Sequence, residues 1–118
     1  NSIRAENINL NAAKLGVDWI EVIESDIMDA LNKLDRPDAV FIGGGLSADL
    51  FSKIWEIIPA GTRLVVNGVT IETDRLIIDC AKNFGGQLLR FEYSQPKQIG
   101  GKSSWKASYP ITQLVVVR

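Results

Sequence analysis

The sequence predicts an α/β fold of three layers, in which helices pack on a mostly parallel sheet through right-handed crossovers. Short runs of apolar and β-branched residues alternate along the chain with longer segments whose apolar residues recur at helical spacing. Clusters of glycine and proline separate these segments. The last two predicted strands have no helix between them, so we expect an antiparallel pair at one end of the sheet.

The first third of the chain predicts two helices and one strand. Residues 2–15 predict a helix that Gly16 ends in a left-handed conformation. WIEVIE, residues 19–24, is short and rich in strand-forming residues, and Asp26 can cap the helix that follows. The apolar positions at helical spacing are Ala5, Ile8, Ala12 and Leu15 in the first helix, and Ile27, Ala30, Leu31 and Leu34 in the second. Asp35-Arg36-Pro37 ends this part of the chain.

The middle of the chain repeats a strand and a helix twice. DAVFI, residues 38–42, predicts a buried strand, and TRLVVN, residues 62–67, predicts another. A helix follows each strand: Pro59-Ala60-Gly61 ends the first, and Thr70 caps the second, which ends at Gly85-Gly86. Their predicted buried positions are Leu50, Phe51, Ile54, Ile57 and Ile58, and then Ile77, Cys80, Ala81 and Phe84.

The last third predicts two strands and a loop. QLLRFEY, residues 87–93, alternates apolar and polar residues as a half-exposed strand does. Residues 94–107 are rich in glycine, serine and lysine, which predicts a loop, and YPITQLVVVR closes the chain as the last strand. Ligands of such sheets bind outside the carboxyl ends of the strands. Those ends are Asp26, Gly43–Gly45 and Asn67-Gly68.

Composition bounds the possible classes of protein. A chain of 118 residues can bury one hydrophobic core, and 46% hydrophobic with 23% charged residues is typical of neither a disordered nor a membrane protein. The first residues contain no signal-peptide core, so we expect a cytoplasmic location. Cys80 is the one cysteine and histidine is absent, which excludes an internal disulfide, a Ser-His triad and most zinc sites, and we expect no metal.

Charge is unevenly distributed along the chain. The net charge of -1 gives no reason to expect nucleic acid as a partner. Residues 93–118 contain no Asp or Glu, whereas Lys97, Lys102, Lys106 and Arg118 are basic. This end could face an anionic ligand, or it could lack acids by chance.

Three residue types could bind a ligand, two at the predicted strand ends and one in the predicted loop 94–107. Gly43–Gly45 are a poor match to a phosphate-binding loop, because their spacing fits neither G-x-x-x-x-G-K-[ST] nor G-x-G-x-x-G. They could instead form a surface without side chains against which a ligand lies, or a tight turn. Asp26 could accept a hydrogen bond from a base or cap its helix. Trp105 stands among lysines and could stack on a flat ligand or anchor its loop, while we expect Trp19 and Trp55 to pack in the core or on a helix face.

Four stretches together resemble the decarboxylating precorrin methyltransferase family of cobalamin biosynthesis. These are IESDIMDAL, DAVFIGGG, PAGTRLVVNGVTIET and the basic segment before the last strand, and the resemblance covers residues 1–118. It implies a Rossmann-like class I methyltransferase fold, S-adenosyl-L-methionine as cofactor with S-adenosyl-L-homocysteine as product, and a precorrin-type tetrapyrrole as substrate. It also implies methylation of the macrocycle with loss of the carboxyl of one acetate side chain, and a homo-oligomer, either dimer or tetramer.

The resemblance assigns roles to several residues. Asp26 and Ile27 would border the adenine of the cofactor. Gly43–Gly45 would form the wall between the methyl donor and the macrocycle, with Gly43 and Gly44 on the side of the cofactor and Gly45 on the side of the substrate. From charge, we expect Lys97, Lys102 and Lys106 to pair with carboxylates of the macrocycle, beside Trp105. No residue is singled out as catalytic.

One part of the family pattern is missing from this sequence. The glycine-rich methionine-binding loop and the acidic residue that holds the ribose both precede the region that residues 1–118 resemble. We therefore expect these residues to be the C-terminal portion of one S-adenosylmethionine-dependent methyltransferase domain within a longer protein. The alternative is a non-catalytic α/β scaffold or oligomerisation domain that has lost its cofactor loop.

Overall fold

The computed structural model describes residues 2–31 and 33–118, which divide into two compact units, one ending at Asp35 and the other spanning Arg36–Arg118. In the first unit, α1 spans Ser2–Leu15 and α2 spans Ile27–Leu31. In the second, the order is β1 (Ala39–Ile42), α3 (Ala48–Ile57), β2 (Arg63–Gly68), α4 (Ile71–Phe84), β3 (Gln87–Phe91), β4 (Ser94–Ile99), β5 (Lys102–Ala107) and β6 (Ile111–Val117). None of the described helices is long and apolar enough to cross a membrane.

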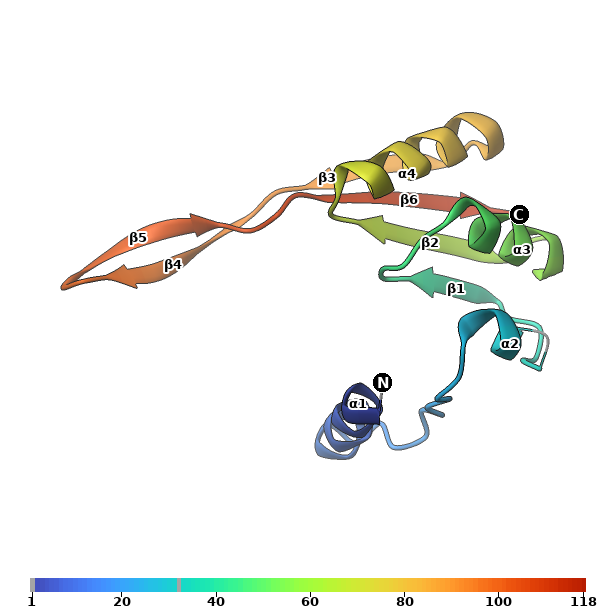
Figure 1. The fold of residues 1–118 in the computed structure, drawn as a ribbon, viewed down its shortest axis with the longest axis horizontal. Helices are drawn as coiled ribbons and strands as arrows, with labels where there is room; N and C mark the ends of the chain where they lie inside the picture. The colour runs from blue at the N-terminus through green and yellow to red at the C-terminus, as the bar shows by residue number, and fades with distance from the viewer. Residues whose placement is uncertain (1, 32) are drawn as a thin grey trace. The chain divides into compact units, whose positions relative to one another are not determined.

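The second unit contains the predicted mixed sheet, with strand order β1-β2-β6-β3. β1 and β2 are parallel, and β6 runs antiparallel to both β2 and β3. The last strand thus lies between two strands that share one direction, so the predicted antiparallel last strand is confirmed (Figure 1). Among the described residues the sheet is mixed, because β1 and β2 form a parallel pair whereas the pairs β2–β6 and β3–β6 are antiparallel.

Both helices of this unit cover the same face of the sheet. Alternate residues of β2 and β6 are buried, among them Leu64, Val66 and Leu114. α4 packs on this face, because a Cβ placed on Gly68 would meet the side chains of Thr73 and Ile77. α3 joins α4 through ring contacts of Phe51 and Trp55 with Phe84, whose centroids lie 5.1 Å and 4.8 Å away. Trp55 therefore packs on a helix face as predicted.

The caps and breaks of these helices follow from their sequences. Ser47 caps α3 by accepting a hydrogen bond from the Leu50 amide at 3.1 Å, and Thr70 caps α4 through the Thr73 amide at 3.2 Å. Gly16, Gly61 and Gly85 all have positive φ. Each lies at or shortly after the end of a helix, where the sequence predicted the helix to stop.

The strand predicted at residues 19–24 is wrong. Residues 16–26 contain neither helix nor strand, and the described part of the first unit offers no second strand with which this segment could pair. Strand hydrogen bonds need such a partner. The side chain of Trp19, predicted to be packed, is 79% exposed.

The first unit also buries less than its helical pattern predicts. Of the predicted inner positions of α1, Ala12 is buried but Leu15 is 77% exposed. α2 ends at Leu31, short of the predicted Leu34, and residue 32 of that prediction lies outside the described residues.

The loop predicted at residues 94–107 is wrong as well. β4 and β5 form a two-stranded antiparallel hairpin that turns at Gly100-Gly101, where Gly100 has φ +58°. Two glycines between two extended runs favour such a tight turn, and the polar composition concealed it. Figure 1 shows the hairpin leaving the sheet between β3 and β6.

Candidate functional site

The carboxyl ends of β1, β2 and β3 meet at one edge of the sheet. β1 and β2 are parallel, and β3 shares their direction because both β2 and β3 are antiparallel to β6. The loop after β1, the turn after β2 and the start of the hairpin after β3 therefore lie along this edge, where α/β sheets bind their ligands.

Gly43–Gly45 form the loop after β1, and the three residues are exposed. Gly45 has φ +72°, so the turn itself requires glycine there. A Cβ on Gly43 would come within 3.0 Å of the Phe41 ring, whereas a Cβ on Gly44 would meet no atom within 4 Å. The tight turn thus explains Gly45, and it leaves Gly44 as a bare surface that the fold itself does not require.

The carboxyl end of β2 combines a packing glycine with a polar pair. Gly68 cannot carry a side chain, because its Cβ would come within 2.5 Å of Thr73 Cγ2. On the face of the sheet away from α4, the Gln113 amide donates to Asn67 Oδ1 at 2.8 Å. This bond fixes the orientation of the Asn67 side chain, which the sequence alone did not indicate.

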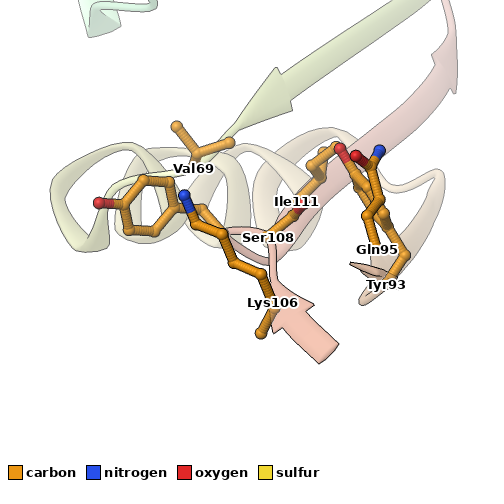
Figure 2. A pocket seen from close by; sticks show the side chains of 8 residues that line it. Val69, Tyr93, Gln95, Lys106, Ser108 and Ile111 are labelled. Carbon is orange, nitrogen blue, oxygen red and sulfur yellow. The ribbon is translucent and has the colours of Figure 1, made fainter. Parts of the chain in front are cut away.

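A hollow of about 540 Å³ lies at the same edge, where the hairpin leaves the sheet (Figure 2). We call it the hairpin-base hollow. Its lining residues are Val69, Tyr93, Gln95, Lys106, Ala107, Ser108, Tyr109 and Ile111. Of these, sequence reasoning singled out Lys106 alone. Most of the others lie in or next to the hairpin, whose residues 94–107 were predicted to form a loop, so their positions at strand ends could not be recognised.

The three predicted lysines share one face of the hairpin. Cross-strand partners point to the same side, and Gln95 pairs with Lys106, Lys97 with Ser104, and Ile99 with Lys102. Trp105 pairs with Pro96 and therefore projects from the opposite face, where it is 74% exposed. The hairpin thus brings the lysines together and separates them from the tryptophan.

Asp26 and Ile27 belong to the first unit, so they are described apart from the other candidates. Asp26 Oδ1 accepts a hydrogen bond from the Met28 amide at 2.9 Å, which is the predicted cap of α2. Its other carboxylate oxygen accepts no hydrogen bond from any residue in the described ranges. Asp26 can therefore cap the helix and still accept a hydrogen bond from a ligand.

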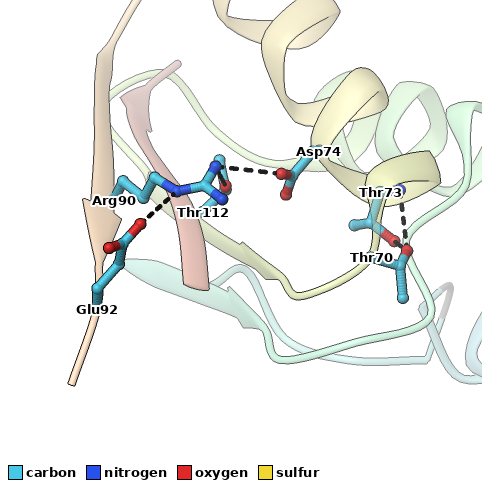
Figure 3. Close-up of polar contacts among 6 residues, drawn as sticks. All are labelled: Thr70, Thr73, Asp74, Arg90, Glu92 and Thr112. Atoms are coloured by element: carbon cyan, nitrogen blue, oxygen red, sulfur yellow. Dashed lines mark hydrogen bonds and ion pairs between the residues drawn. The ribbon is translucent and has the colours of Figure 1, made fainter. Parts of the chain in front are cut away.

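A polar cluster on the helix side of the sheet ties β3 to α4 (Figure 3). Arg90 Nη1 lies 3.4 Å from Asp74 Oδ2 and 3.5 Å from Thr112 Oγ1, and Arg90 Nε lies 3.2 Å from Glu92 Oε1. Arg90 is 55% exposed, so this arrangement resembles a surface ion-pair network more than a site. No group of acidic or cysteine side chains within residues 2–31 and 33–118 is arranged to hold a metal ion.

Comparisons with known proteins agree over the whole chain. A family model described as a precorrin methyltransferase domain matches residues 1–118. The chain is 39% identical over 111 residues to a Sinorhizobium protein named precorrin-6Y C(5,15)-methyltransferase [decarboxylating], and 34% identical over 116 residues to a protein of the same name from Mycobacterium tuberculosis. These matches cover 93% and 98% of this chain but only 27% and 29% of the relatives.

Solved structures give the same result. The C-terminal domain of precorrin-6Y C5,15-methyltransferase from Rhodobacter capsulatus superposes with a TM-score of 0.92 at 37% identity. A putative precorrin-6Y C5,15-methyltransferase targeted domain from Corynebacterium diphtheriae gives 0.91 at 34% identity. Both cover 100% of this chain, and the chain spans 65% and 71% of those structures.

Proposed function

Because the chain belongs to the precorrin methyltransferase family, we propose that it is the C-terminal portion of an S-adenosylmethionine-dependent methyltransferase domain that methylates and decarboxylates a precorrin macrocycle. The observation that carries this proposal is the family match along all of residues 1–118. The chain spans 27% and 29% of the two curated relatives named above, so the proposal concerns the longer protein of which these residues form a part.

The candidates for cofactor binding are Asp26 and Ile27 in the first unit and, considered separately, Gly43 and Gly44 in the second. The unbonded oxygen of Asp26 suits the exocyclic amine of an adenine, and the exposed Ile27 lies next to it. Gly44 leaves the backbone after β1 open to close approach, and neither its φ nor its neighbours require glycine. S-adenosylmethionine would supply the methyl group as a sulfonium. The protein would align donor and acceptor, which alone can account for a large part of such an acceleration.

The proposed substrate site is the neighbouring part of the carboxyl edge. Gly45 continues the bare loop, and Lys97, Lys102 and Lys106 line one face of the hairpin that starts at this edge. A macrocycle bearing carboxylates suits this face. Trp105 projects from the other face, so it would contact the same macrocycle only at the rim of the hairpin or from another subunit of a homo-oligomer.

Calorimetric titration of S-adenosylhomocysteine tests the cofactor assignment. It is titrated into the 118-residue chain and, in parallel, into the product of the complete native reading frame. We expect the complete product to bind. If neither binds although both are folded, the cofactor assignment fails and the non-catalytic scaffold replaces it. Light scattering of the complete product tests the expected dimer or tetramer.

Substitutions at Asp26 separate its two roles in the protein that binds. Asp26→Asn keeps an oxygen that can cap α2 and accept from an amine, whereas Asp26→Ala removes both functions. We expect Asp26→Ala to lower the affinity for S-adenosylhomocysteine roughly tenfold, which corresponds to the loss of a hydrogen bond to a charged group. Asp26→Asn should lower this affinity less. Thr70→Ala is the control, because it removes a helix cap of the same kind from α4. Equal affinities of Asp26→Ala and the wild type would leave Asp26 as a cap only.

A further inference from the structure

We propose that the hairpin-base hollow is a carboxylate-binding subsite, with Lys106 as its cation and the side chain of Gln95 also in its lining. This inference rests on the proposed function for the identity of the natural ligand, but the hollow itself is a feature of the fold. The inference gives Lys106 a role that Lys97 and Lys102 do not share, whereas the sequence alone gave no reason to distinguish the three lysines.

The position of the hollow is the first argument. Val69 follows β2, Tyr93 follows β3 and Ile111 begins β6, so the hollow opens at the carboxyl edge where ligands of such sheets bind. Gln95 and Lys106 are cross-strand partners in the second pair from the base of the hairpin, and both side chains line this opening (Figure 2). Lys97 and Lys102 lie farther along the hairpin toward Gly100 and do not line it.

The charge of the hollow is the second argument. Lys106 is its one charged lining residue, and the lining contains no carboxylate. Within the part of the chain that the structure describes, no acidic side chain forms an ion pair with Lys106. The hollow therefore presents a positive charge that the protein itself does not neutralise, which favours an anion.

The lining chemistry selects a carboxylate on an otherwise apolar arm. Val69, Ala107 and Ile111 supply apolar surface, and Gln95, Ser108 and Tyr109 supply groups that can donate hydrogen bonds. A few convergent polar groups within an apolar lining are typical of a site for a small organic group. The relatives are named as decarboxylating enzymes, and a substrate that loses carbon dioxide must carry a carboxylate.

Propionate is the first probe, because it carries one carboxylate on a short apolar arm. It is titrated into the 118-residue chain while backbone amide signals are followed by NMR, with sodium chloride at equal ionic strength as the reference. We expect saturable shifts at Val69, Ser108 and Ile111. K106Q should weaken binding roughly tenfold, whereas K102Q and K97Q should change it less than about threefold. Equal effects of the three substitutions, or shifts spread along both hairpin strands, would overturn the subsite.

Uroporphyrin, a water-soluble tetrapyrrole with many carboxylates, is the second probe, and its affinity is measured by fluorescence for the same variants. If the chain binds propionate in the hollow but the complete native product does not bind uroporphyrin, the subsite stands and the proposed tetrapyrrole substrate is contradicted. If uroporphyrin binds and K106Q binds it as well as the wild type does, the subsite is wrong and the proposed substrate class stands. Loss of affinity in K106Q alone supports both.

Discussion

Two glycines at the carboxyl edge differ in what they do for the fold. A Cβ on Gly68 would lie 2.5 Å from Thr73 and 3.0 Å from Ile77, so Gly68→Ala must push α4 away from β2. We expect it to lower the free energy of unfolding by about 1–3 kcal/mol, as other overpacking substitutions do. Gly44→Ala is the matched control, because its Cβ would meet nothing within 4 Å, and we expect no loss or a gain of up to about 1 kcal/mol. Urea unfolding of both variants measures the difference, and equal midpoints would contradict it.

We expect the thiol of Cys80 to react more slowly than that of an ordinary cysteine. Burial, and secondarily the negative charge of Asp79, raises its pKa. At pH 8 a smaller fraction of Cys80 than of free cysteine is therefore in the reactive thiolate form. We expect iodoacetamide to alkylate Cys80 more slowly than free cysteine, and the rate to rise only at higher pH. Asp79→Asn should restore part of the rate, since burial remains the larger cause. Unfolded protein should react at the ordinary rate, and an equally fast reaction of the folded chain would show the prediction to be wrong.

The hairpin is an element whose stability is local. Every residue of β4 and β5 is exposed, so the hairpin contributes no buried side chain to the core. Gly100 has φ +58°, a conformation that a β-branched residue adopts only with strain. We expect Gly100→Val to speed hydrogen exchange of the β4 and β5 amides while leaving the global unfolding midpoint unchanged. Gly100→Asn, which suits this turn, should exchange like the wild type. A lower global midpoint for Gly100→Val would instead show that the hairpin supports the sheet.

The elements that sequence reasoning predicted correctly are those with strong local signals and a partner within reach. β1, α3, β2 and α4 combine a periodic apolar pattern with a cap or a glycine stop, and each buries side chains against the next. WIEVIE is about as apolar as the segments that do form strands. A strand forms only if it finds a partner to pair with, however, and the pattern of one segment carries no information about that partner. The prediction for the hairpin was wrong in the opposite sense, because its polar residues form a ladder mainly through backbone hydrogen bonds.

The candidate site shows the same division. The glycine loop and the lysines were visible in the sequence, since both lie at predicted strand ends or in a segment without acids. The register of β4 and β5 places Trp105 on the face opposite the lysines. The same register decides that Lys106, and neither Lys97 nor Lys102, lines the hairpin-base hollow. Register is a property of the paired strands and could not be predicted while the segment was treated as a loop.

At the scale of the whole molecule, the hydrophobic core comes almost entirely from residues 36–118. Every buried apolar side chain in the described chain except Ala12 belongs to this unit, including the helix residues Phe51, Ile54 and Ile77. Cooperative unfolding depends on such a core. We therefore expect a fragment of residues 36–118 to unfold in one cooperative urea transition, with a midpoint close to that of the full chain and a slightly smaller m-value. Circular dichroism and the change in fluorescence of Trp55, which packs between the helices, should give the same midpoint. Loss of the transition in the fragment would show that residues 1–35 supply packing that the core needs, and the division into two units would then not describe the folding unit of this chain.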